Sequence, residues 1–185
     1  MNIETKYAEC CAIESDINHL LPYIRQYAAM GESYTEMGVR RPTSIYAGLS
    51  AGCKVVRGYD IGRYPEVDEL EQLAKDAGVD FEFIQKDVLT IDIEPCDMLF
   101  IDTWHVYGQL KAELARHAPN VKTRIGFHDT TSFEWVNEDA YEGVSQGLEP
   151  GVGLWPAIQE LLDTGEWVIE FRTTINNGLT IIKRA

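Results

Sequence analysis

The chain has 185 residues, of which 45% are hydrophobic and 25% charged, which is enough for one globular domain with a substantial core. Its 30 acidic residues outnumber 16 basic ones and leave a net charge of −14. Such a surface repels phosphate backbones and anionic lipid, so nucleic acid and membrane surfaces are poor partners. No signal peptide or bilayer-spanning run is visible, and the four cysteines lack metal-finger spacing. We expect one cytoplasmic domain over residues 1–185 with reduced thiols.

The first half of the chain alternates between helical and strand patterns. Apolar residues at helical spacing predict an N-terminal helix over 14–30 that stops at Gly31. Beyond it, the core of the domain is expected to span 33–185. Short strands are predicted over 33–39, 53–61 and 81–88, and helices over 43–52 and 66–78.

The second half continues the alternation and then changes character. Strands are predicted over 97–102 and 123–129, and helices over 105–118 and 153–165. The last two strands, 166–174 and 179–185, are joined by "INNG", and Asn-Gly is a strong hairpin signal. Five strand–helix alternations before a hairpin predict an α/β, Rossmann-like doubly wound sheet with helices on both faces and one antiparallel strand.

The first three strand ends carry candidate ligand-binding residues, because ligands of such sheets lie beyond the carboxyl ends of the strands. Ser44 opens a helix, whose N-terminus suits a carboxylate or a phosphate. Asp60 ends the second strand 22 residues after Gly38, where an acid commonly binds ribose hydroxyls. Asp87 ends the third strand and could lie near an adenine amino group. The alternative is that these residues form a tight turn and solvated strand-end acids. The arginines at 40–41 could meet an anionic group or pair with surface acids.

The fourth and fifth strands end in the most informative residues. Asp102 stands at the tip of an apolar strand, with His105 soon after it, and His128 and Asp129 end the next strand. Two carboxylates and an imidazole could hold Mg²⁺ or Mn²⁺, which would grip substrate oxygens and lower the pKa of a bound hydroxyl. His105 could then accept the hydroxyl proton. The alternative is that both aspartates cap helices or turns and that His105 is a surface residue.

A long acidic segment over 134–149 has no helical period. A loop of this length near strand tips is often a substrate lid. Trp135 and Tyr141 could line a pocket there, or they could form a small local core.

With these strand ends laid out, the chain resembles class I S-adenosylmethionine-dependent methyltransferases, nearest to metal-dependent small-molecule O-methyltransferases of the catechol, macrocin or cephalosporin-biosynthesis type. The stretch "TEMGVRRPTS" is similar to the first motif of that family, and "YDIG" to the second. The resemblance implies that Glu36 and Gly38 approach the methionine part of the cofactor and that Ser44 holds its carboxylate. It likewise implies that Asp60 binds the ribose. Asp87 is a further candidate for the cofactor site, from its position at the strand end.

Two further stretches, "DMLFIDTWHVY" and "GFHDTT", resemble the fourth and fifth motifs. The resemblance implies that Asp102 binds metal and acts in catalysis with His105 as the base, and that Trp104 lies beside the cofactor. His128 and Asp129 would be the remaining metal ligands. The resemblance also implies the strand order 3-2-1-4-5-7-6.

The leading hypothesis is methyl transfer from S-adenosylmethionine to a hydroxyl of a small molecule, such as a sugar or a natural-product intermediate, with or without a divalent metal. A methyltransferase-fold binding protein without catalysis is the alternative. A nicotinamide-dependent enzyme is a third interpretation, which the absence of a GxGxxG motif disfavours. A homodimer is compatible with this function.

Overall fold

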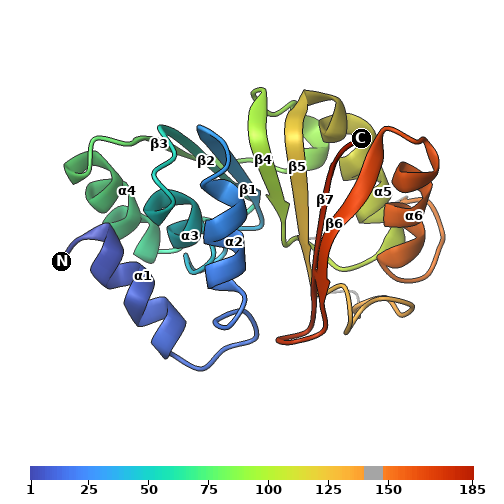
Figure 1. Ribbon diagram of the computed structural model, residues 1–185, viewed down its shortest axis with the longest axis horizontal. Helices are drawn as coiled ribbons and strands as arrows, with labels where there is room; N and C mark the ends of the chain where they lie inside the picture. The colour runs from blue at the N-terminus through green and yellow to red at the C-terminus, as the bar shows by residue number, and fades with distance from the viewer. Residues whose placement is uncertain (140–147) are drawn as a thin grey trace.

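A seven-stranded sheet runs through the computed structural model (Figure 1), which describes residues 1–139 and 148–185. Its strands are β1 (Ser33–Met37), β2 (Val55–Asp60), β3 (Asp80–Gln85), β4 (Cys96–Ile101), β5 (Val121–His128), β6 (Trp167–Thr173) and β7 (Leu179–Arg184). They lie in the order β3-β2-β1-β4-β5-β7-β6. Strand β7 alone runs antiparallel to its neighbours β5 and β6. The predicted fold class and strand order are therefore confirmed.

Helices cover both faces of this sheet (Figure 1). They are α1 (Ile3–Ala12), α2 (Leu21–Ala28), α3 (Ile45–Ser50), α4 (Glu66–Asp76), α5 (Tyr107–His117) and α6 (Trp155–Asp163), with two short 3-10 turns, η1 (Val88–Thr90) and η2 (Ala118–Asn120). Along β4, Met98 and Phe100 enter the core under α1 to α4. Leu99 and Ile101 enter the core under α5 and α6. Because successive strand side chains point to opposite faces, β4 is buried on both sides.

The N-terminal region corrects one prediction, because no single helix spans 14–30. Residues 14–20 form turns instead, in which Ser15 Oγ accepts hydrogen bonds from the backbone N–H groups of Ile17 and Asn18. Pro22 lies in the first turn of α2, where its missing N–H costs nothing. The sequence analysis also missed α1, which is capped by the side chain of Asn2.

The predicted C-terminal hairpin is present, and its turn is built differently from the Asn-Gly expectation. Asn176 and Asn177 both have positive φ, 42° and 66°, and the N–H of Gly178 donates to the carbonyl of Ile175 at 2.9 Å. These two asparagines are thus the central residues of the turn, and both adopt the left-handed conformation that a primed turn requires.

The carboxyl ends of β1, β2, β4 and β5 meet at one edge of the sheet. The N–H of Asp102 donates to the carbonyl of Met37 at 2.9 Å, and that of Gly38 donates to the carbonyl of Tyr59 at 2.8 Å. Gly38 has φ +91°, and a Cβ there would lie 2.0 Å from the carbonyl oxygen of Asp102. Only glycine fits where these two strand ends cross. Within the described residues, no helix is long and apolar enough to cross a bilayer.

Candidate functional site

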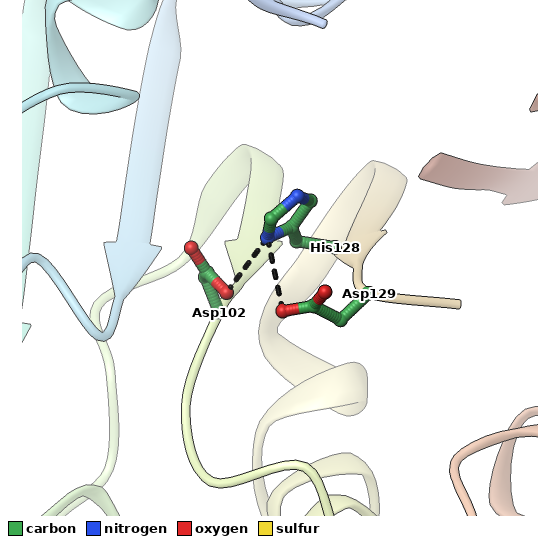
Figure 2. A group of neighbouring side chains, drawn as sticks. All are labelled: Asp102, His128 and Asp129. Atoms are coloured by element: carbon green, nitrogen blue, oxygen red, sulfur yellow. Dashed lines mark hydrogen bonds and ion pairs between the residues drawn. The ribbon is translucent and has the colours of Figure 1, made fainter. Parts of the chain in front are cut away.

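The three predicted metal ligands lie together at the tips of β4 and β5, as Figure 2 shows. The ligand atoms that Asp102, His128 and Asp129 offer all lie within 4.8 Å of one another. Nδ1 of His128 is 3.1 Å from Oδ1 of Asp102 and 3.3 Å from Oδ2 of Asp129. The structure therefore brings these side chains into one group, as expected from adjacent strand ends.

His105 joins the same group from the loop before α5. Its Nε2 is 3.2 Å from Oδ1 of Asp102 and 3.0 Å from Oδ2 of Asp129. Its Nδ1 lies 3.0 Å from Oε2 of Glu138, which also accepts the backbone N–H of His105. The ring of Phe133 stacks on the imidazole, with 5.0 Å between ring centroids and 2° between planes. The imidazole is thus held on both edges and on one face.

The group contains opposite charges that stabilise each other. Burial by itself would lower the pKa of His128, but the carboxylates of Asp102 and Asp129 outweigh it and raise the pKa to about 11. Burial also opposes the charge of His105, yet hydrogen bonds to Asp102 and Glu138 raise its pKa to about 9. Burial would raise the pKa of Asp102, whereas the charge of His128 and the hydrogen bond from His105 hold it well below its usual range. In the absence of another cation, both imidazoles are therefore protonated at neutral pH.

This arrangement bears on the predicted base. A general base must offer an unprotonated atom to the substrate, and each ring nitrogen of His105 faces a carboxylate. The base role of His105 stays a prediction, and it requires that imidazole to lose its proton and part from at least one of these carboxylates.

Asp60 stands at the end of β2, where it organises the first loop. Its Oδ2 accepts the backbone N–H of Arg40 at 2.6 Å, and its Oδ1 accepts that of Gly62 at 2.8 Å. Arg40 has φ 45°, so the loop turns back through a left-handed residue. A carboxylate has about four acceptor positions. Asp60 therefore keeps acceptor positions for ribose hydroxyls beyond the two that the loop uses.

Glu36 and Ser44 contact each other inside the protein. Glu36 is fully buried and Ser44 is 5% exposed. The Ser44 hydroxyl donates to Oε1 of Glu36 at 2.8 Å, and the Tyr34 hydroxyl donates to Oε2 at 2.6 Å. Burial raises the pKa of Glu36 to about 8, although the two hydrogen bonds by themselves would lower this pKa. Their predicted contacts with a methionine moiety stay predictions, and in this structure the two side chains bind each other.

The remaining predicted site residues lie along the same edge. Oδ1 of Asp87 accepts the N–H of Leu89 at 2.9 Å and so begins η1. The indole N–H of Trp104 donates to the carbonyl of Asp139 at 3.3 Å. Trp135 is 59% exposed. Tyr141, the other predicted pocket residue, lies outside the described residues, as does half of the predicted lid.

Sequence reasoning missed three residues that orient the histidines. Glu138 was placed only within an acidic loop. Asp16 and Asn176 offer backbone carbonyls 3.1 and 3.2 Å from Nε2 of His128. A backbone carbonyl leaves no trace in the sequence, whereas the acid of Glu138 could have been suspected from its position soon after the fifth strand.

No protein-family model matches the sequence, and no curated protein matches it either. Solved structures match its fold. One is the 1,6-didemethyltoxoflavin-N1-methyltransferase of Burkholderia thailandensis with bound S-adenosylhomocysteine, at a TM-score of 0.64 and 16% identity, covering 94% of this chain and 80% of that one. Another is the magnesium protoporphyrin IX methyltransferase of Synechocystis with bound S-adenosylhomocysteine. It matches at a TM-score of 0.64 and 13% identity, covering 98% of this chain and 94% of that one. A candidate caffeoyl-CoA O-methyltransferase of Staphylococcus aureus matches at a TM-score of 0.67 and 15% identity, covering 100% of this chain and 93% of that one.

The fold and strand order thus define the chain as having the class I S-adenosylmethionine-dependent methyltransferase fold. Identities this low show the fold and not the substrate. On the cofactor side, the spare acceptor positions of Asp60 fit a ribose. On the metal side, Oδ1 of Asp129 is buried and, among the described residues, has no hydrogen-bond partner. It belongs to the carboxylate whose Oδ2 contacts His105 and His128, so Asp129 has an acceptor position left that a cation could fill.

Proposed function

We propose that the protein transfers a methyl group from S-adenosylmethionine to a hydroxyl of a small molecule. The observation that supports this most is the coincidence of two features on one sheet edge. Asp60 ends β2 with acceptor positions free for a ribose, and the Asp102, His128 and Asp129 group lies at the tips of β4 and β5. In this fold the donor and the acceptor must meet beyond these strand ends.

In the proposed reaction, Asp60 binds the ribose, and Asp87 and Trp104 flank the adenosine. Gly38 lets the first loop approach the tip of β4 closely. The exposed Arg40 and Arg41 offer positive charge for the methionine carboxylate, which Ser44 at the start of α3 would also contact. Rate would come mainly from holding the acceptor oxygen in line with the sulfonium methyl group. Asp102, His128 and Asp129 would hold a divalent ion, which supplies charge that makes the acceptor hydroxyl more acidic.

Calorimetric titration with S-adenosylmethionine and S-adenosylhomocysteine tests the cofactor directly. We expect wild-type protein to bind both ligands and Asp60→Asn to lose binding. The oxygen of the asparagine amide can accept one of the two backbone N–H groups, but its NH2 group is a donor and would face the other N–H. Asp163→Asn, which changes an exposed acid on α6, should bind like wild type. Absence of binding to both ligands by wild type would remove the methyltransferase proposal.

A binding protein that kept the fold without catalysis is the second candidate. The internal Glu36–Ser44 hydrogen bond and the fully engaged imidazole of His105 favour it. It predicts binding of S-adenosylhomocysteine with no methyl transfer to any acceptor in a screen of hydroxyl compounds using a labelled methyl donor. Transfer to any acceptor would decide for the enzyme.

A further inference from the structure

The histidines and aspartates at the strand tips form a closed ring of four atoms. Nε2 of His105 and Nδ1 of His128 each face Oδ1 of Asp102 and Oδ2 of Asp129. The four nitrogen–oxygen distances lie between 3.0 and 3.3 Å. Nε2 of His105 and Nδ1 of His128 each contact both carboxylates, so the four side chains do not form two separate ion pairs. The four side chains form one group, and their four contacting atoms surround a common point.

The outer nitrogens of both imidazoles are fixed as hydrogen-bond donors. Nε2 of His128 lies 3.1 and 3.2 Å from two backbone carbonyls, which can only accept. Nδ1 of His105 lies 3.0 Å from the carboxylate of Glu138. A histidine that donates from its outer nitrogen directs the lone pair of its inner nitrogen at the opposite side. Here both inner nitrogens point at the same two carboxylate oxygens.

Lone pairs on two nitrogens and two carboxylate oxygens repel one another unless positive charge lies between them. Two protons can supply it, and so can one divalent ion. A tetrahedral ion with bonds of about 2.0–2.1 Å, as zinc makes to nitrogen and oxygen, separates its ligands by roughly 3.3 Å. The four observed nitrogen–oxygen distances, 3.0 to 3.3 Å, are close to that spacing. Outer nitrogens that donate to a carboxylate or to backbone carbonyls are also typical of metal-bound histidines.

We propose that His105 is the fourth protein ligand of a two-histidine, two-aspartate metal site, and that this site takes Zn²⁺ in preference to Mg²⁺. Imidazole is a preferred ligand for zinc, whereas Mg²⁺ prefers six oxygen ligands and keeps several waters. The other oxygen of the Asp129 carboxylate, Oδ1, is buried and has no hydrogen-bond partner among the described residues, so the carboxylate has a second acceptor position that an ion could use. The catalytic use of the ion rests on the proposed function, but its binding does not.

The proposal gives His105 a task other than that of base. As a ligand, its Nε2 is occupied by the ion, and Glu138 orients the ring through Nδ1. The four protein ligands would leave only an added coordination position for a substrate oxygen, as zinc sites allow when they expand to five ligands.

Zinc affinity of the full-length chain tests the proposal. The protein is stripped with a chelator and titrated with Zn²⁺ in competition with a chromophoric chelator, and Mg²⁺ is titrated separately by calorimetry. Wild type should bind one Zn²⁺ and bind it more tightly than Mg²⁺. His105→Ala should weaken binding by more than the roughly 10–100-fold expected for loss of an outer-shell partner, whereas Glu138→Gln should fall within that range. His19→Ala, which removes an exposed imidazole, should leave the affinity unchanged.

A measurement on wild type avoids any folding defect of the variants. The zinc K-edge absorption spectrum of the loaded protein should require two imidazoles and two oxygen ligands. One imidazole only, equal zinc affinity in His105→Ala, or tighter binding of Mg²⁺ would overturn the proposal. Calorimetry with S-adenosylmethionine is independent of these readouts. Zinc binding without cofactor binding would remove the proposed function and keep this inference. Cofactor binding together with only one imidazole on the zinc ion would keep the proposed function and remove this inference.

Discussion

At the scale of single residues, buried polar groups set the chemistry of this edge of the sheet. Glu36 is fully buried in β1 and accepts hydrogen bonds from Tyr34 and Ser44. Its pKa of about 8 follows mainly from burial. The native state therefore keeps a proton on Glu36 at neutral pH that the unfolded chain, with an ordinary carboxyl, has released.

This proton predicts a specific pH dependence. Because the pKa of Glu36 is raised in the native state, rising pH should lower the free energy of unfolding between about pH 4.5 and 8. The slope should approach about 1.4 kcal/mol per pH unit. Glu36→Gln cannot ionise, so its free energy of unfolding should lack this slope. Urea unfolding of both proteins at pH 6 and pH 8 measures the difference. Glu32→Gln, at an exposed glutamate, is the control, and parallel profiles for wild type and Glu36→Gln would contradict the prediction.

Gly38 allows a second prediction at the residue scale. Gly38 and Gly52 have similar φ, +91° and +85°, but a Cβ meets the carbonyl of Asp102 only at Gly38. Gly52→Ala should lose about 1–2 kcal/mol of stability from its left-handed backbone. Gly38→Ala should lose at least about 2 kcal/mol more, because the tip of β4 must move. Urea unfolding measures both values, and equal losses would show that the close approach costs nothing.

At the scale of elements, the β6–β7 hairpin supports the site from behind. Its turn residue Asn176 accepts the N–H of His19 through its side chain, donates to the carbonyl of Ser15, and offers its own carbonyl to His128. The hairpin therefore ties the N-terminal turns to the tip of β5. The contacts of Asn176 with His19 and Ser15 join residues 157 and 161 positions apart in the chain.

Substitutions of Asn176 separate the effect of its side-chain hydrogen bonds from the effect of its left-handed backbone conformation. Asn176→Gly keeps the left-handed conformation and loses two side-chain hydrogen bonds, so we expect a loss of about 1–3 kcal/mol in the free energy of unfolding. Asn176→Ala should lose about 1 kcal/mol more, because alanine tolerates φ 42° poorly. Denaturant unfolding of the two variants measures the difference. Greater stability of Asn176→Ala than of Asn176→Gly would contradict the conformational part of the prediction.

At the scale of the whole molecule, charge is the dominant feature. A net charge of −14 produces self-repulsion in the compact state, and salt screens it over about 10 Å at 0.1 M. We expect the urea midpoint of unfolding to rise between low salt and 0.5 M NaCl, with an unchanged dependence on urea. A midpoint that falls with salt would mean that the local ion pairs outweigh the net repulsion.

Prediction from sequence succeeded where local pattern carries the information. The apolar run of β4 predicted a buried strand, and the structure buries it on both faces. The hairpin signal located β6 and β7. Prediction failed over 14–30, where the turn around Ser15 and the preference of Pro22 for a helix start outweighed a continuous apolar spacing. Helical spacing alone does not show where a helix begins.

For the site, the sequence by itself determined that Asp102, His128 and Asp129 would meet, because adjacent parallel strands must end at one edge. Only the tertiary structure shows that His105 contacts both Asp102 and Asp129 through Nε2. Its ring is oriented by Glu138 from the loop after β5, and that of His128 by carbonyls of Asp16 and Asn176. Partners so distant in the chain, two of them backbone atoms, have no sequence pattern. The position of a strand end follows from topology, but the direction of a lone pair follows from packing.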